Sequence, residues 1–204
     1  MFLKCLTFSF VALGLVPAIA HAQRPTIPVA VAEGVLGRTR TAPSGRPPSV
    51  SDILSKTDVV VRGIVGEPRA YLSGDGRDVY TDYVVRNAVV WFDSQVASSP
   101  LPGSMPAITV TQLGGTIVIN GLEYIHKEEG LPPLTPGMEA LLLLQRVKGR
   151  YEIAGTFYGA FRIVGGTLLP LTSEETFAPE YRNVAADQAV AGIVTQLRAL
   201  TQRR

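Results

Sequence analysis

Residues 79–92 read VYTDYVVRNAVVWF, and this stretch decides the fold class. In its first half, β-favouring residues alternate with polar ones, as in a strand with one buried face: Val79, Thr81, Tyr83 and Val85. In its second half, apolar residues occupy both faces: Ala88, Val89, Val90, Trp91 and Phe92. Such a long strand with two apolar faces near its end is typical of one that bends across a barrel corner.

The segments on either side of this stretch also predict short strands. Residues 58–65 form a β-branched run that Gly66 and Pro68 end, and a third strand is expected near residues 107–113, after a Pro/Gly/Ser loop at 98–106. Residues 116–125 predict a hairpin, because Asn120-Gly121 tolerates positive φ at both central positions of a type I′ turn.

The remaining half of the chain predicts further strands and one terminal helix. Residues 139–147 are nearly continuously apolar and too short, between Pro136-Gly137 and Lys148-Gly149, for a helix. Strands are also expected at residues 151–154, 160–164 and 168–171. Apolar residues then recur at three- and four-residue spacing, which predicts an amphipathic helix: Ala186, Ala189, Val190, Ile193, Val194, Leu197 and Leu200.

We therefore expect a mainly β fold, a small five-stranded, partly open barrel with a C-terminal α-helix, over residues 51–204. One helical turn capped by Ser51 or Asp52 should precede the first strand.

Two different segments are expected before this domain. Residues 1–22 have the pattern of a secretory signal peptide: Lys4, an apolar run, and small residues up to Ala22, so the mature chain should begin at Gln23. The apolar run is too short to span a bilayer, which predicts a periplasmic or extracellular protein with no transmembrane segment after cleavage. Residues 23–50 are rich in Pro and Arg, and we expect a flexible linker that completes no strand ladder.

Composition argues against several classes of protein. Removal of residues 1–22 takes away one of the 19 Lys and Arg residues. The mature chain then has 18 basic and 17 acidic residues, so its net charge is close to zero. A nucleic-acid partner is therefore not expected, because phosphate binding needs a basic excess. The one cysteine, Cys5, lies inside the signal, so the mature chain has no disulfide or zinc–thiolate site.

Four stretches, taken in order, resemble the exported bacterial proteins with an OB-type (oligonucleotide/oligosaccharide-binding) barrel, the netrin-like or tissue-inhibitor-of-metalloproteinase-like group. They are DVVVRGIV at 58–65, YTDYVV at 80–85, PGMEALLLL at 136–144, and YEIAG at 151–155 running into GAFRI at 159–163. The resemblance covers roughly residues 55–165 and implies an OB-like barrel. Eukaryotic inhibitors of this group ligate the protease zinc through an N-terminal cysteine. The mature chain has none, so that mechanism does not transfer.

Four aromatic residues are the candidate ligand-binding side chains: Tyr80, Tyr83, Trp91 and Phe92. On the barrel surface they would form a stacking face for a sugar or an extended peptide. In the interior they would be the largest core residues, and apolar neighbours favour this alternative for Trp91 and Phe92.

One weaker candidate is a metal site formed by Glu123, His126 and Glu128, since imidazole and carboxylate suit zinc. Glu123 and His126 have opposite parity on a strand, so they share a face only if the chain bends; the alternative is a solvated loop. A second metal pattern, Asp75 and Asp78 in GDGRD at 74–78, lacks the bidentate Glu of a calcium loop and favours a surface turn.

The sequence contains no nucleophile elbow, zinc-protease motif or phosphate loop, so we expect no catalytic residues and no cofactor. The function expected is an exported, non-enzymatic binding module whose partner is an envelope protein or an extended peptide, held at a strand edge or on the barrel face. Two alternatives remain open. One is a peptidase inhibitor acting through the loop at 98–106, and the other is a hydrolase or metal protein centred on His126.

Overall fold

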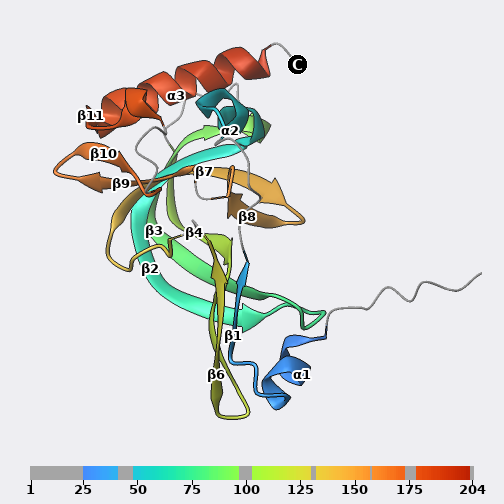
Figure 1. Cartoon of the computed structure of the whole chain (residues 1–204). Helices are drawn as coiled ribbons and strands as arrows, with labels where there is room; N and C mark the ends of the chain where they lie inside the picture. Colours follow the sequence, from blue (N-terminus) through green and yellow to red (C-terminus); the bar gives the residue numbers. More distant parts are fainter. Residues whose placement is uncertain are drawn as a thin grey trace, which may run out of the picture.

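The computed structural model describes residues 25–40, 48–96, 103–129, 132–156, 158–172 and 178–202. The predicted signal peptide lies outside these ranges. The described chain is mainly β, with a closed five-stranded barrel and a C-terminal helix, α3 (Ala186–Thr201), as Figure 1 shows. The predicted fold class is confirmed.

The barrel is a circuit of five strands, each of which pairs with two others. β2 (Val59–Leu72) pairs antiparallel with β3 (Val79–Asp93), and β3 pairs antiparallel with β4 (Gly103–Leu113). β4 then pairs in parallel with β8 (Arg150–Ile153). β7 (Glu139–Val147) completes the circuit, because it pairs antiparallel with both β8 and β2. The parallel β4–β8 pair therefore closes a barrel that was expected to be partly open.

β3 changes its inward face at a β-bulge, in the half of the strand where apolar residues occupy both faces. Arg62 lies opposite Val89 and Ile64 opposite Arg86, so Gly63 faces two residues of β3. Asn87 has φ 50°, and side chains from Ala88 onward reverse their parity. The buried residues of β3 are consequently odd-numbered before the bulge and even-numbered after it: Val79, Thr81, Tyr83, Val85, Ala88, Val90 and Phe92.

A second, three-stranded sheet lies beside the lower end of the barrel in Figure 1. Its strands β5 (Gly115–Ile119) and β6 (Leu122–Glu128) form the predicted hairpin, with φ 52° at Asn120 and 79° at Gly121. The short helix α1 (Ile27–Ala32) packs against this sheet through one small cluster: Ile27, Val31, Val79 and Tyr124.

The third strand of this sheet corrects the prediction of a linker without a strand ladder at residues 23–50. β1 (Gly37–Arg40) pairs in parallel with β6 over four residues. The strand is possible because it contains no proline, and Pro28 lies in the first turn of α1, where a missing N–H costs little. Of the residues between α1 and α2, 41–47 lie outside the described ranges.

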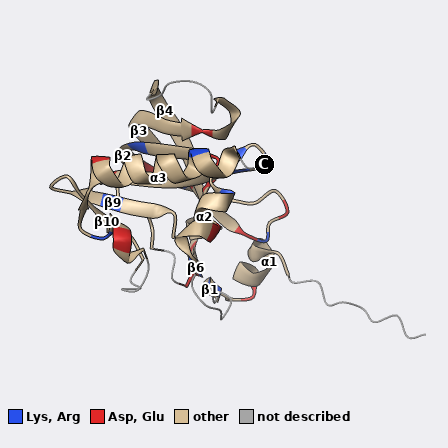
Figure 2. Cartoon of the chain, turned by 90° about the horizontal axis from the view of Figure 1, so that it is seen from above, with Lys and Arg blue, Asp and Glu red and all other residues tan. Residues whose placement is uncertain are grey.

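A layer of small elements covers the upper end of the barrel (Figures 1 and 2). It contains α2 (Val50–Lys56), β9 (Ala160–Val164), β10 (Thr167–Pro170), β11 (Val184–Ala185), the 3₁₀ turns η1 (Ser94–Val96) and η2 (Pro179–Tyr181), and α3. The apolar stripe of α3 packs onto β9 and β10 in one buried cluster, which includes Phe161, Leu168, Ile193 and Leu197. A second cluster fills the barrel interior around Val61, Val85 and Leu142.

Several boundaries differ from the sequence prediction, among them the start of β4, which is at Gly103, the start of α2 and the end of β2. The N-cap of α2 is Ser49, whose side chain accepts a hydrogen bond from the N–H of Asp52 while the Asp52 carboxylate accepts from the N–H of Ser49. Ser51 and Asp52 are therefore inside the helix. β2 continues through Pro68 to Leu72, because an irregularity between Val65 and Pro68 lets the strand pass the proline without breaking its pairing with β3.

Candidate functional site

The structure does not bring the four predicted aromatic residues onto one face. Tyr83 and Phe92 are each 3% exposed and belong to different core clusters. Tyr80 and Trp91 are partly buried and lie on the outside of β3, at its two ends. Strand alternation separates Tyr80 from Tyr83, and the two are already on opposite faces before the bulge. Ligand binding by any of the four stays a prediction.

Tyr80 belongs to an aromatic and polar cluster on the outer barrel surface, which we call the tyrosine face. Tyr71 of β2 lies directly opposite it, with the ring centroids 6.1 Å apart and the planes tilted by 32°. The guanidinium carbon of Arg150, at the start of β8, lies 4.9 Å from the centroid of the Tyr80 ring. The face therefore combines two partly buried rings with a cation stacked on one of them.

A hydrogen-bonded carboxylate lies beside these rings. Asp82 Oδ1 accepts hydrogen bonds from Thr111 Oγ1 at 2.7 Å and from the Tyr71 hydroxyl at 3.2 Å. Thr111 in turn lies opposite Glu152 in the parallel β4–β8 pair. The tyrosine face is thus Tyr71, Tyr80, Asp82, Thr111, Arg150 and Glu152, contributed by four strands of the barrel.

The electrostatics of this face favour neutral hydroxyls among charged neighbours. Burial, followed by the charge of Asp82, raises the pKa of Tyr71. Burial, followed by the charge of Asp78, raises the pKa of Tyr80. Burial also raises the pKa of Glu152, against the opposing charges of Arg150 and Lys148. Both tyrosines therefore keep their hydroxyl protons at neutral pH: Tyr71 donates its proton to Asp82 and can accept from a ligand, whereas Tyr80 can donate to one.

Two turns border the tyrosine face. One is the β2–β3 connection, where Ser73 Oγ accepts from the N–H of Arg77 and of Asp78, and Asp75 Oδ1 accepts from the Ser73 hydroxyl at 2.6 Å. This arrangement confirms the surface-turn interpretation of residues 74–78. The other is the β7–β8 turn at Lys148 and Gly149, both with positive φ. In OB-type barrels these two loops border the ligand surface of the neighbouring strands.

His126 is buried, which contradicts the solvated-loop alternative. It lies in β6 with its side chain 0% exposed, and its ring contacts Arg38 from β1 and Glu128 from its own strand, each at 3.1 Å from Nε2. Arg38 also binds Asp78 at 2.6 Å. Desolvation, followed by the charge of Arg38, lowers the pKa of His126 to about 4. This network fastens β1 to β6 and to the β2–β3 turn.

The geometry also separates the residues of the predicted metal site. Glu123 is exposed on the opposite face of β6, as its parity predicts, and only His126 and Glu128 are in contact. Among the described residues no group of three or more His, Cys, Asp or Glu side chains could hold a metal ion. The His126 ring, which would have to reach a substrate in a hydrolytic reaction, is enclosed, and the hydrolase alternative stays a prediction.

Most residues of the tyrosine face were not singled out from sequence. Tyr71 follows Pro68, where the first strand was expected to have ended. Arg150 and Glu152 reach Tyr80 and Thr111 only through the parallel β4–β8 pairing, which joins segments about 40 residues apart. The one local signal was Tyr80 itself, at the beginning of the fold-deciding strand.

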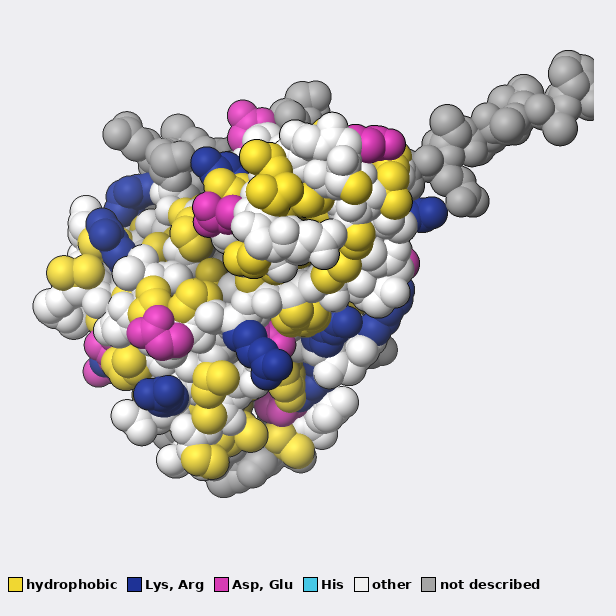
Figure 3. Space-filling model, turned by 90° about the horizontal axis from the view of Figure 1, so that it is seen from below, with side chains coloured by type: hydrophobic (Ala, Val, Ile, Leu, Met, Phe, Trp, Pro, Cys, Tyr) yellow, Lys and Arg dark blue, Asp and Glu magenta, His cyan; other side chains and the backbone are white. Residues whose placement is uncertain are grey.

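The lower surface of the molecule carries basic, acidic and hydrophobic side chains next to one another. Seen from below, Lys and Arg side chains gather among hydrophobic and acidic ones, without a continuous patch of one sign (Figure 3). In the described part of the chain no helix is long and apolar enough to cross a membrane. The inhibitor loop predicted at 98–106 is described only from Gly103 onward, where it belongs to β4, so that alternative stays a prediction.

Comparison with known proteins gave no relative: no family model, no curated protein and no solved structure matches this chain.

Proposed function

We propose that this chain is a non-enzymatic binding module that holds an extended peptide segment of another protein on the tyrosine face. The observation that carries the proposal is the Tyr71–Tyr80 pair with Arg150 stacked on Tyr80, held on rigid strands between two turns. Paired aromatic rings offer contact area at low entropic cost, and their hydroxyls supply hydrogen bonds to a peptide backbone.

The charges of the face support a peptide rather than a nucleic acid. Asp82 and Glu152 lie among the rings, and their carboxylates would repel a phosphate backbone. Arg150 and the neighbouring Lys148 supply the opposite sign, so a peptide with both acidic and basic side chains is complementary to this surface. The nearly neutral composition of the chain supports the same conclusion.

The export of the protein is part of this proposal. The pattern of residues 1–22 supports export of the module, so its partner is proposed to be another exported or envelope protein. We also propose a relationship to the netrin-like or tissue-inhibitor-of-metalloproteinase-like group, on the basis of the four sequence stretches and of the barrel to which their strands belong.

A displayed library of random 12-residue peptides, selected against the chain from Gln23 onward, tests this function. The dissociation constant of the best selected peptide is then measured for the parent, for Tyr80→Ala and for Leu122→Ala. Leu122 is 46% exposed at the tip of the β5–β6 hairpin and serves as the control. We expect Tyr80→Ala to weaken binding about tenfold or more, and Leu122→Ala to leave it unchanged. Equal affinity of the parent and Tyr80→Ala would refute the proposal.

A further inference from the structure

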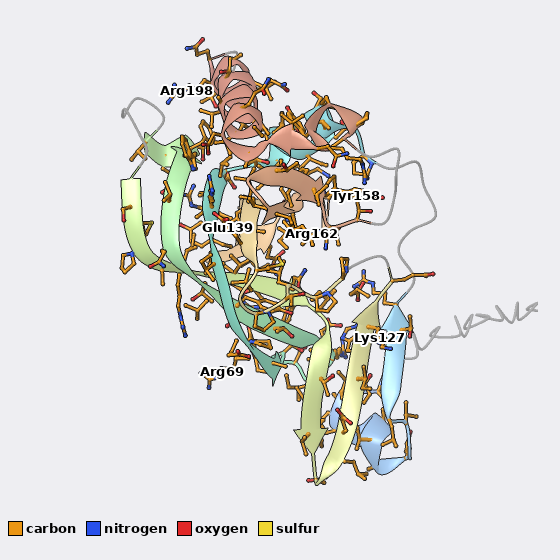
Figure 4. The ribbon with its side chains drawn as sticks, turned by 90° about the vertical axis from the view of Figure 1, so that its left-hand side faces the viewer. Arg69, Lys127, Glu139, Tyr158, Arg162 and Arg198 are labelled. Carbon is orange, nitrogen blue, oxygen red and sulfur yellow. The ribbon has the colours of Figure 1, made fainter. Side chains whose placement is uncertain are left out.

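A separate groove opens farther along β3, where its bulge lies beside β2 and where β2 pairs with the start of β7. Its volume is about 360 Å³, and its walls are Arg62, Gly63, Ile64, Asn87, Val89, Trp91 and Glu139. Figure 4 shows that Glu139 lies in the half of the barrel nearer α3, whereas Arg69 lies toward the opposite end of β2. We call this groove the tryptophan groove. It is at the low end of the size range of small-molecule sites, about 300–1,000 Å³.

The bulge accounts for the position of the groove. Two residues of β3 lie between the Arg62–Val89 and Ile64–Arg86 pairs, and Asn87 adopts φ 50° there. β-Bulges re-aim side chains and are concentrated beside functional sites. Here the bulge brings the Asn87 amide into the same groove as the Trp91 indole.

The charged groups of the groove are paired with one another. Arg62 Nε donates to Glu139 Oε1 at 2.7 Å, and Arg62 Nη1 donates to Asp187 Oδ1 of α3, also at 2.7 Å. One cation therefore faces two carboxylates, which disfavours an anionic ligand. The paired groups still offer carboxylate acceptors and guanidinium donors to a neutral, hydroxyl-rich molecule.

Trp91 supplies an apolar wall of the groove. Its indole Nε1 is buried and has no hydrogen-bond partner among the residues that the structure describes. Because this nitrogen is enclosed, a ligand in the groove would contact the indole ring and not its N–H group. Ile64 and Val89 complete the apolar side of the groove.

A peptide strand finds no place to pair in this groove. β2 pairs with β3 and β7, β3 with β2 and β4, and β7 with β2, β8 and β9, so the lining strands offer no free edge. Recognition has to come from side chains, namely an aromatic ring with a planar amide, a carboxylate and a guanidinium around it. A ligand that has apolar ring faces, and hydroxyls that both donate and accept hydrogen bonds, matches these side chains.

We propose that the tryptophan groove binds a neutral saccharide unit. The sugar ring lies against the Trp91 indole, and Asn87 and Glu139 bind its hydroxyls. This inference does not rest on the proposed peptide-binding function, since it concerns a different surface with different residues.

Trp91 is the chain's single tryptophan, so intrinsic fluorescence reports directly on this groove. The probes are the neutral disaccharides cellobiose, maltose and N,N′-diacetylchitobiose, with glucuronate and trialanine amide as charged and peptide comparators. We expect a saturable change in Trp91 emission with at least one neutral disaccharide. Absence of a change with all three, or tighter binding of glucuronate or trialanine amide, would overturn the proposal.

Asn87→Gly tests the contact without straining the backbone, since glycine tolerates the positive φ at this position. Asn183→Gly is the matched control. Asn183 also has a positive φ, 61°, and it is an exposed residue that does not line the groove. We expect Asn87→Gly to weaken disaccharide binding about tenfold, the equivalent of one hydrogen bond, and Asn183→Gly to leave it unchanged. Equal effects of the two substitutions would overturn the assignment of Asn87.

Discussion

The backbone N–H of Val79 donates a hydrogen bond to Nδ1 of His126, with 3.2 Å between the nitrogens. A ring nitrogen that accepts a hydrogen bond carries no proton, so the imidazole is neutral and its proton is on Nε2. Nε2–H then donates to Glu128 Oε1 at 3.1 Å. The nearby Arg38 guanidinium further opposes a positive charge on the ring.

The first prediction concerns pH. A histidine in the unfolded chain titrates near 6.5, whereas His126 in the fold titrates near 4, so the unfolded state binds the proton first as pH falls. The contribution of His126 to the free energy of unfolding is complete above about pH 6.5 and falls until about pH 4. The loss is about 3 kcal/mol at most.

His126→Asn isolates this effect, because the Asn side-chain oxygen can replace Nδ1 as acceptor and does not titrate. Burial also raises the pKa of Glu128, which acts in the opposite direction and is present in both proteins. Urea unfolding at pH 7 and pH 4.5 should show a smaller stability loss on acidification in His126→Asn than in the parent. Equal losses of stability in the two proteins would show that the pKa of His126 does not differ between the folded and the unfolded state.

The cap of α2 gives the second prediction. Ser49→Ala removes the side-chain oxygen that accepts from the N–H of Asp52, while the backbone N–H of residue 49 can still donate to Asp52, and should lower the free energy of unfolding by about 1 kcal/mol. Ser51→Ala, two residues later inside the same helix and exposed, should change it by less than about 0.5 kcal/mol. Thermal or urea unfolding of both variants measures these losses of stability. A larger loss in Ser51→Ala than in Ser49→Ala would place the cap at Ser51.

The barrel strands could largely be predicted because their signals are local. Residues 139–147 and 160–164 match β7 and β9, since glycines or prolines lie beside an apolar run at each. β1 could not be predicted in this way. Its four residues, GRTR, have no apolar pattern, and the strand exists only because β6 offers it an edge. The partners of Tyr80 were missed for the same reason, since non-local strand pairing assembles them.

The third prediction tests the close packing at the bulge of β3. A Cβ atom added at Gly63 would lie 2.7 Å from both the carbonyl oxygen of Arg86 and Cγ1 of Val85. Gly63→Ala should therefore destabilise the protein by about 2 kcal/mol. Gly192→Ala, in open space inside α3, should stabilise it by about 0.5–1 kcal/mol, because alanine favours helix. Equal melting temperatures for the two variants would contradict this account of the bulge.

The fourth prediction concerns how β1 is held. Arg38 Nη2 binds Asp78 at 2.6 Å in a half-buried pair, whereas Arg40 is 56% exposed and lies 4.0 Å from Glu128. Arg38→Ala should loosen β1, so the amides of Ile125 and Glu129, which donate to Leu36 and Arg40, should exchange hydrogen about tenfold faster. Arg40→Ala should leave their exchange nearly unchanged, because the Arg40 side chain is exposed and its contact with Glu128 is long. Equal acceleration by both substitutions, or acceleration that extends to the amides of β7, would show that β1 is not fastened through Arg38.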